Sequence, residues 1–452
     1  MTDNTKEFAT KAIPALLWQY ALPAVITQII AAVYNICDRM FLGQCVGALA
    51  IAGLAVTMPI MNIIHAFGSL VGAGSSARMS IVLGKRDIPW AENILGNSML
   101  LTFFFGAIFT SVWYVFADPI LSLFGASPET IAYAREYMNI VMPGMFMTTV
   151  TFNLCNLIRA SGYAQKSMWI LAGGAVLNIV LDALFIFVLD WGIAGAAWAT
   201  TISMTTSAVF SAVHFVSPKS FIRFRRHGWA PKFYIFRNIL AIGISPFSMN
   251  VAGSAVVALL NMQLLRYGGD NAVAANGIAN SFGPLVIMLS IGICQGMQPI
   301  AGYNYGAGLH HRLREVYVLA MKWNLIIGFI GATLVVTVPR YLAMAFTHDA
   351  ALLDVTAPAL TLILVMSPFI TFTITNSQFF QSIDKPWIAI VTSLSRQVLF
   401  LTPMIFLVPL VFEQIGIGGL WGVFASCTIS DVMGAALAAY LLYTQRAILR
   451  NN

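Results

Sequence analysis

The chain has 452 residues, of which 59% are apolar and only 9% are charged, and its formal net charge is +7. Soluble globular domains carry about 25% charged residues, so this composition excludes an ordinary soluble fold. A membrane-spanning helix needs about 20 predominantly apolar residues. Because no water reaches membrane depth, each such segment is expected to be a helix that satisfies its own backbone hydrogen bonds.

The predicted spans follow one another along almost the whole chain. The polar start, 1–12, precedes an apolar segment that is too long for a signal peptide, so the first helix itself is expected to direct insertion. The predicted helices are 14–42, 51–81, 93–117, 131–158, 167–189, 193–216, 239–266, 274–305, 316–339, 352–381, 387–411 and 416–443. The sequence therefore predicts an all-α integral membrane fold of about twelve transmembrane helices.

Residues 23–201 and 246–425 read as two copies of one unit. Pro23 aligns with Pro246 (246 − 23 = 223), and Gly192 aligns with Gly416 (416 − 192 = 224). Repeats of this size in an apolar chain are typical of secondary transporters, which bind their substrate between or within the repeats. Further matches at nearly the same offset pair Gly53 with Gly277, Gly84 with Gly308 and Pro143 with Pro368.

Each copy holds an even number of helices, so both copies enter the membrane in the same orientation and form parallel repeats. We expect two pseudo-symmetric six-helix bundles with V-shaped lobes. The first is an N-lobe of helices 1–6 (residues 1–216), and the second is a C-lobe of helices 7–12 (residues 239–452). Residues 217–238 are the expected cytoplasmic linker between the lobes. Two such bundles leave a cleft that rocking could expose to either side of the membrane.

The basic residues predict the orientation of the helices. If the spans alternate, nearly all Lys and Arg residues of the loops fall on one side, and the opposite links near 44–50, 190–192 and 412–415 carry none. The positive-inside rule then places both termini and the basic 217–238 loop in the cytoplasm, where the loop orients the chain and contacts lipid headgroups. The positive net charge follows from topology and requires no nucleic-acid partner.

Three of the 17 acidic residues, Asp38, Asp182 and Asp431, are predicted inside the spans. A charge at membrane depth costs at least about 2.5–3.5 kcal/mol, so it persists where it is paired or functional. Asp38 shares a helical stripe with Gln28 and Asn35 and lies roughly 7 Å inside the outer end of the first helix. At the repeat offset it aligns with the neutral Asn261 (38 + 223 = 261), so the charge belongs to the first copy alone.

Asp182 lies in the fifth helix, roughly 12 Å from its outer end, and Asn178 precedes it by one turn. Thr200 in the sixth helix reaches a similar depth. With Asp38, these groups form a predicted cation-coupling site in the outer half of the first lobe. Hard oxygen ligands of this kind suit Na⁺, whereas two nearby carboxylates in a poorly solvated cavity favour a proton. The simpler alternative is that each acid is only capped by neighbouring amides and hydroxyls.

Asp431 is interpreted differently, because Arg396 lies at a similar depth on the preceding predicted helix. The two depths are roughly 18 and 15 Å from the inner end of each helix. A structural ion pair that ties the last two helices together is the simplest account, and a role in substrate binding is the alternative.

The fourth helix carries Asn153 and Asn156 on one face, and Thr149, Met145 and Met142 continue that stripe. Adaptable thioethers and uncharged amides suit a cavity that accepts varied ligands. We assign Asn35, Met145, Asn153 and Asn156 to a substrate cavity.

The sequence offers no enzyme motif, so the chain is not expected to be an enzyme or to need a cofactor. It contains no CxxC, HExxH, Walker loop or dinucleotide fingerprint, and its five cysteines show no paired spacing. The adjacent His310 and His311 lie in a basic loop and are interpreted as solvated side chains. No metal is expected beyond a possible Na⁺ at the coupling site.

Several motifs together resemble the multidrug and toxic compound extrusion (MATE) transporters over nearly the whole chain. They are Pro23 in a first helix that runs to Asp38-Arg39-Met40-Phe41-Leu42-Gly43, the stretches 72–78 and 83–84, Gln295-Gly296-Met297-Gln298-Pro299, Gly302-Tyr303-Asn304-Tyr305-Gly306, and Asn178-Ile179-Val180-Leu181-Asp182. The set is specific, although no single motif would suffice. The resemblance implies a two-lobe, cation-coupled antiporter that exports amphipathic, often cationic drugs by alternating access.

The resemblance also assigns roles to individual residues. Pro23 matches the proline at which the first helix bends in this family. Asp38, Asn178, Asp182 and Thr200 match its first-lobe cation site, and Asn153 and Asn156 resemble residues that line its drug cavity. Some members carry acids in the seventh and tenth helices. Here those helices offer only neutral groups, which resembles the DinF-like and MepA-like bacterial branch: Asn250, Ser254, Asn261, Asn376, Gln378 and Gln381.

The resemblance therefore implies a monomeric, multi-pass protein of the bacterial inner membrane that exchanges H⁺ or Na⁺ for drugs and contributes to antibiotic resistance. The identity of the coupling ion stays open. A flippase for lipid-linked saccharides is the nearest alternative, but it would be expected to line its cavity with several Arg or Lys residues. A sensor or channel without a transported substrate is the second alternative.

Overall fold

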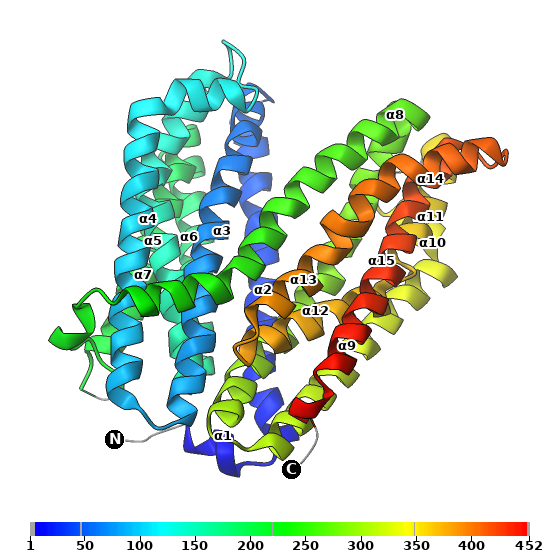
Figure 1. The fold of residues 1–452 in the computed structure, drawn as a ribbon. Helices are drawn as coiled ribbons and strands as arrows, with labels where there is room; N and C mark the ends of the chain where they lie inside the picture. The colour runs from blue at the N-terminus through cyan, green and yellow to red at the C-terminus, as the bar shows by residue number, and fades with distance from the viewer. Residues whose placement is uncertain (1–4, 46–47, 219, 348, 450–452) are drawn as a thin grey trace. The chain divides into compact units, whose positions relative to one another are not determined.

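The structure is a computed structural model of the chain, and its helices are shown in Figure 1. It describes all residues except 1–4, 46–47, 219, 348 and 450–452, and it does not describe the side chains at 35–40, 42–45, 48–52, 55 and 448–449. Within this described part every regular element is a helix, as the sequence predicts.

The first repeat consists of long helices joined by short connections. Its elements are α1 (Lys6–Thr10), α2 (Ile13–Cys45), α3 (Ala48–Gly84), α4 (Ile88–Leu123), α5 (Ile131–Ala160), α6 (Ala164–Asp182), the π-helical η1 (Ala183–Val188) and α7 (Gly192–Val216). The segment that follows contains a short 3₁₀-helix, η2 (Arg226–Trp229).

The second repeat begins with one very long helix and is more interrupted near its end. Its elements are α8 (Phe233–Gly306), α9 (His310–Thr337), α10 (Pro339–Met344), α11 (Ala350–Leu364), α12 (Ser367–Ser382), α13 (Pro386–Leu394), the π-helical η3 (Ser395–Leu401), α14 (Thr402–Gln414), α15 (Gly419–Thr444) and η4 (Arg446–Leu449).

Eleven helical segments of the described chain are long and apolar enough to cross a membrane. One of them, α8, has 74 residues and contains a non-helical residue, Gly269, at φ 63° and ψ −160°. Glycine adopts a positive φ without the Cβ penalty of other residues, so α8 turns there from one span into the next. The predicted helices 239–266 and 274–305 are its two halves, and the predicted membrane fold is confirmed.

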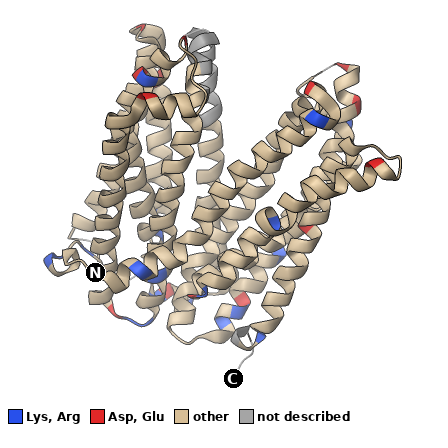
Figure 2. Cartoon of the chain, turned by 45° about the horizontal axis from the view of Figure 1, so that its top comes forward, with Lys and Arg blue, Asp and Glu red and all other residues tan. Residues whose placement is uncertain are grey.

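Charge is distributed as expected for such a fold. Figure 2 shows Lys, Arg, Asp and Glu gathered mainly near the ends of the helices, with long uncharged stretches between them. Large apolar side chains are exposed along these stretches, for example Val115 at 69% and Phe210 at 61%. Exposed apolar side chains in such number are typical of protein that faces lipid.

Contacts divide the chain into two compact units. Unit 1 comprises 1–11, 22–247 and 302–307, and unit 2 comprises 12–21, 248–301 and 308–452. The chain therefore changes unit inside a continuous helix three times: between Ala21 and Leu22 of α2, and between Phe247 and Ser248 and between Ala301 and Gly302 of α8. The first two changes lie next to the pseudo-equivalent prolines Pro23 and Pro246.

The start of α8 is packed closely into unit 1. A Cβ atom on Gly243 would collide with the backbone of Leu70, and one on Gly74 would collide with the backbone of Ile239. Small residues that let two helix backbones approach are a common way to associate helices in membranes. The sequence predicted Ile239 and Gly243 in the first helix of the C-lobe, 239–266.

The 217–238 segment is attached to α4 rather than running free. Asn97 Nδ2 donates to the carbonyl oxygens of Gly228 and Ala230, both at 3.1 Å, and its Oδ1 accepts from the backbone N–H of Lys232 at 2.7 Å. Glu92 lies 3.5 Å from Arg225 Nε. One buried amide thus satisfies three backbone groups of the segment.

Candidate functional site

The buried acid of unit 1 lies where α6 changes into the π-helical η1. Asp182 is the last residue of α6 and is fully buried, with 0% of its surface exposed. Asn178 lies one turn earlier and Thr200 lies on α7, and both are also buried. Single π-turns inside α-helices occur frequently at functional sites. The structure therefore brings together three of the four residues predicted for the cation-coupling site.

Hydrogen bonds join these three residues into one group. In one orientation of the Asn178 amide, its Nδ2 donates to the Thr200 hydroxyl at 3.3 Å. In the other orientation, the nitrogen donates to Asp182 Oδ2 at 2.9 Å and the oxygen accepts from the backbone N–H of Thr200 at 3.1 Å. The second orientation satisfies both neighbours, and amide orientation is assigned from such networks.

Asp38 and Asn35 lie on α2 at positions whose side chains are outside the described residues. Their convergence with Asp182 stays a prediction. Pro23 lies inside the continuous helix α2, where it removes one backbone donor. The bend assigned to it also stays a prediction.

A cavity of about 170 Å³ opens beside Asn178 within unit 1. Four helices line it, with Thr27 and Tyr34 on α2, Thr148 on α5, Asn178 on α6 and Ser207 on α7. The Thr27, Thr148 and Ser207 hydroxyls each donate to a carbonyl of their own helix. Each hydroxyl oxygen therefore keeps acceptor capacity for a ligand or water. Asn178 connects this cavity to the buried carboxylate.

Sequence reasoning did not find most residues of this cavity, although part of the signal was present. Thr27, Ile30, Ala31 and Tyr34 follow helical spacing on one face of α2. On α6, Gly174 and Ala175 are small residues on the approach to Asn178. A stripe of small and hydroxyl residues on one helix face that ends at a polar amide would have indicated this cavity in the sequence.

Asn153 holds helices together instead of lining this cavity. Its Nδ2 donates to the hydroxyls of Ser98 and Thr102, both at 3.1 Å, and its Oδ1 accepts from Ser75 at 2.8 Å. These bonds join α5 to α3 and α4. The side chain is fully buried, and its predicted place in a substrate cavity stays untested.

Asn156 and Met145, the other α5 residues predicted for a substrate cavity, are also buried. Asn156 Nδ2 donates to the carbonyl of Phe152 at 2.7 Å, and Met145 belongs to the apolar core of unit 1. Neither lines the cavity beside Asn178. Their assignment likewise stays a prediction.

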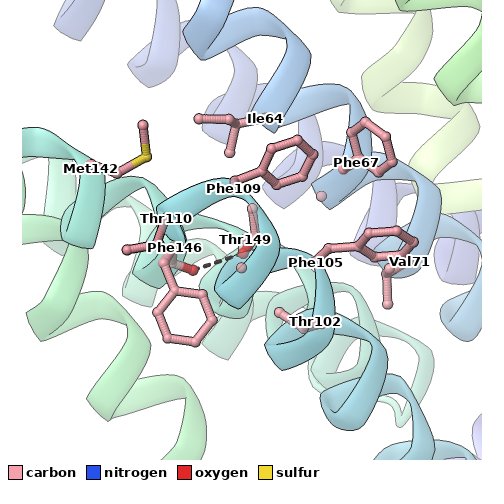
Figure 3. Close-up of a pocket in the computed structure, with 12 residues that line it drawn as sticks. Ile64, Phe67, Val71, Thr102, Phe105, Phe109, Thr110, Met142, Phe146 and Thr149 are labelled. Carbon is pink, nitrogen blue, oxygen red and sulfur yellow. Dashed lines mark hydrogen bonds between the residues drawn. The ribbon is translucent and has the colours of Figure 1, made fainter. Parts of the chain in front are cut away.

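A second, much smaller space lies among aromatic rings between α3, α4 and α5 (Figure 3). Phe67, Phe105, Phe109 and Phe146 surround it, and Thr149 donates to the Phe146 carbonyl at 2.7 Å. Its volume of about 10 Å³ is at the lower limit for one water molecule. This region is a packed aromatic core.

In unit 2 two pairs of neutral side chains are joined by hydrogen bonds. Asn276 donates to Asn261 at 2.8 Å, and Tyr317 donates to Asn376 at 2.9 Å. Asn261 is the residue that aligns with Asp38 in the first repeat, and it bonds to an amide within its own helix. These amides therefore form structural pairs in the described part of unit 2.

The charged pair of unit 2 joins η3 to α15. Arg396 Nε donates to Asp431 Oδ1. The Asp431 side chain is fully buried, whereas 22% of the Arg396 side chain is exposed. Among the described residues, no three His, Cys, Asp or Glu side chains cluster as a metal site would require.

Comparison with known proteins agrees with the repeat and the fold. The MatE family model matches residues 23–184 and 246–407, two segments that begin at the aligned prolines Pro23 and Pro246. The chain is 25% identical to the multidrug export protein MepA of Staphylococcus aureus over 434 residues, which cover 95% of this chain and 93% of MepA. It is 24% identical to MepA of Staphylococcus haemolyticus over 443 residues, which cover 97% and 95% of the two chains.

Solved structures share the same fold along the full length. An outward-facing multidrug resistance MATE family transporter of the MOP superfamily matches with a TM-score of 0.89 and 24% identity, over 99% of this chain and 98% of that chain. A MOP superfamily transporter from Pyrococcus furiosus matches with a TM-score of 0.90 and 23% identity, over 100% and 99% of the two chains. The family model covers both repeats of this membrane-helix fold, and the chain belongs to the MatE family of transporters.

Proposed function

We propose that this protein exports small amphipathic, cationic drugs across the bacterial inner membrane in exchange for a cation. The observation that carries the proposal is the buried Asp182–Asn178–Thr200 group beside a cavity of about 170 Å³ in unit 1. The relatedness to multidrug export proteins of Staphylococcus supports the drug as substrate. The positive-inside pattern supports cytoplasmic termini.

The exchange depends on competition for negative charge in the first lobe. A coupling cation bound at Asp182, with Asp38, neutralises the carboxylate and weakens its attraction for a cationic drug. By linkage, the drug weakens binding of the coupling ion by the same factor. Alternating access carries the ion inward and the drug outward. If one monovalent ion exchanges for one monovalent drug, no net charge moves, and the membrane potential, about 2.3 kcal/mol per charge per 100 mV, contributes nothing.

We propose a proton as the coupling ion. In the orientation that satisfies both neighbours, Asn178 presents its nitrogen to Asp182 and its oxygen to the Thr200 backbone. An amide nitrogen is a donor and cannot ligate Na⁺, which supports a proton at this carboxylate.

Transport by purified protein in proteoliposomes tests the proposal. With an inward proton gradient, the wild type should export a fluorescent cationic dye, and Asp182→Asn and Asp38→Asn should each reduce the initial rate at least about tenfold, which corresponds to about 1.4 kcal/mol. Replacement of Na⁺ by choline should have little effect, and a protonophore should abolish transport.

Asp118→Asn is a matched control, because Asp118 forms an exposed ion pair with Arg135 away from the cavity. It should transport like the wild type, since exposed pairs contribute only about 0–1 kcal/mol. Near-normal transport by both Asp182→Asn and Asp38→Asn would overturn the proposed mechanism.

A further inference from the structure

The Arg396–Asp431 pair of unit 2 lies deep within its spans. Arg396 is ten positions beyond Pro386, where α13 begins (396 − 386 = 10), which is about 15 Å along a helix. It lies in the π-helical segment η3, a local geometry that often accompanies function. Placing a guanidinium at this depth costs free energy unless its charge is paired and its N–H donors are hydrogen-bonded.

The pair uses only part of the guanidinium. Its one hydrogen bond within the described part of the chain runs from Nε to Asp431 Oδ1, although the group carries five N–H donors in a planar fork. The second carboxylate oxygen, Asp431 Oδ2, is buried without a partner among the described residues. A pair that served only to join two helices would be expected to form the bidentate arrangement that Arg and carboxylates favour.

Arg396 lines a small cavity within unit 2 whose other walls are apolar, hydroxyl and amide side chains. Arg396 and Gln397 line this space of about 30 Å³ together with hydroxyl residues of α12 and α13, among them Ser377 and Ser393. Both hydroxyls already donate to backbone carbonyls, at 3.1 and 3.0 Å. Gln397 Oε1 is buried without a partner in the described structure. The cavity therefore contains unused hydrogen-bonding capacity around a positive charge.

The first repeat shows that the fold does not require this ion pair. At the repeat offset, Arg396 aligns with Ala172 (396 − 224 = 172) and Asp431 aligns with Ser207 (431 − 224 = 207). The corresponding helices of unit 1, α6 and α7, pack against one another, and both aligned residues are buried. The charges of unit 2 are therefore an addition to a helix pair that is complete without them.

We propose that the Arg396 cavity binds the carboxylate group of zwitterionic or anionic organic substrates. Arg396 is the recognition residue, and Asp431, which accepts from its Nε, competes with the substrate carboxylate for the positive charge. A cavity of about 30 Å³ has room for roughly two water molecules, which matches the two oxygens of a carboxylate. A planar fork of donors suits that group, and Gln397 can present its amide nitrogen as a further donor. This widens the substrate range beyond the cations of the proposed function.

Binding of two dyes that differ only in this group provides the test. Rhodamine 110 carries a free carboxylate, and rhodamine 123 is its methyl ester, so the first is a zwitterion and the second a cation. Fluorescence polarisation with protein in detergent measures both affinities without any ion gradient. Arg396→Gln combined with Asp431→Asn removes both charges together and avoids a stranded buried carboxylate. The double variant should bind rhodamine 110 at least about tenfold more weakly and rhodamine 123 unchanged.

Asp431→Asn alone gives a result that a structural role would not produce. Without its competing carboxylate, Arg396 is free to use its full fork, so the affinity for rhodamine 110 should rise several-fold while that for rhodamine 123 stays constant. The inference is overturned if rhodamine 110 does not bind the wild type, or if the charge changes affect both dyes equally. Failure of rhodamine 123 to bind the wild type would instead contradict the proposed export of cations.

Discussion

The fifth and sixth helices of each repeat pack together in both units, but the buried polar groups that they carry differ. In unit 1, α6 and α7 bring a buried carboxylate, an amide and a hydroxyl together beside a cavity of about 170 Å³. In unit 2, the corresponding helices bring a guanidinium and a carboxylate together beside a cavity of about 30 Å³. The backbone plan is thus duplicated, while the charge and the available space are specific to each copy.

This difference teaches that a repeat can conserve helix packing and still separate functions. In the first copy the aligned positions hold the small residues Ala172 and Ser207, and Ser207 lines the cavity, whereas a charged pair occupies these positions in the second copy. Substitutions that remove the charged pair of unit 2, or that alter the polar group or fill the cavity of unit 1, test whether the two units have separate functions.

The largest expected effect on stability follows from removing one member of the unit 2 pair. Arg396→Gln leaves Asp431 buried and unpaired, which should destabilise the protein by about 3–5 kcal/mol, as for other broken buried pairs. Adding Asp431→Asn should restore most of that loss, because no buried charge remains. Unfolding in detergent, followed by intrinsic fluorescence, measures both. Equal stability of the single and double variants would show that the pair is not electrostatically coupled.

The next prediction separates two buried asparagines of unit 1. Asn178→Ala should lower drug transport about tenfold, because the donor to Asp182 is lost, a change of about 1.4 kcal/mol. Asn153→Ala should instead lower stability by about 1–3 kcal/mol, because three hydroxyl partners lose their bonds. Transport per folded molecule and thermal unfolding distinguish the two. A large transport defect in stable Asn153→Ala protein would return Asn153 to the substrate cavity.

A smaller effect is expected from filling the unit 1 cavity without altering its charge. Ala175 lines the cavity, so Ala175→Leu should raise the KM for bulky dyes several-fold and leave small cations nearly unaffected. Val176→Leu is the control, since Val176 is 58% exposed on the same helix. Unchanged KM values for a series of dyes of increasing size would indicate that substrates do not enter this space.

Hydropathy and the repeat were sufficient to predict the fold. The predicted spans match the helices because the membrane imposes both length and apolarity on each of them. Asn178, Asp182 and Thr200 were also predicted as neighbours, since one helical turn separates the first two and depth places the third. Opposite charges at similar depth predicted the contact between Arg396 and Asp431.

Features that depend on distant partners could not be predicted in the same way. Helical spacing places Asn153 on a face of α5, but it does not reveal that Ser75 and Ser98 on two other helices occupy that face. The attachment of the 217–238 segment requires Asn97, which lies more than one hundred residues earlier. The break of α8 at Gly269 depends on a backbone angle that cannot be predicted from amino-acid composition.

The change of unit inside α2 and the first change inside α8 have a consequence for how the two units are built from the chain. Residues 12–21 of the first repeat belong to unit 2, and residues 233–247 of the second helical series belong to unit 1. Each half of the gene product therefore lacks a helical piece that the other half supplies. Neither unit is therefore complete until residues from both halves of the chain are present.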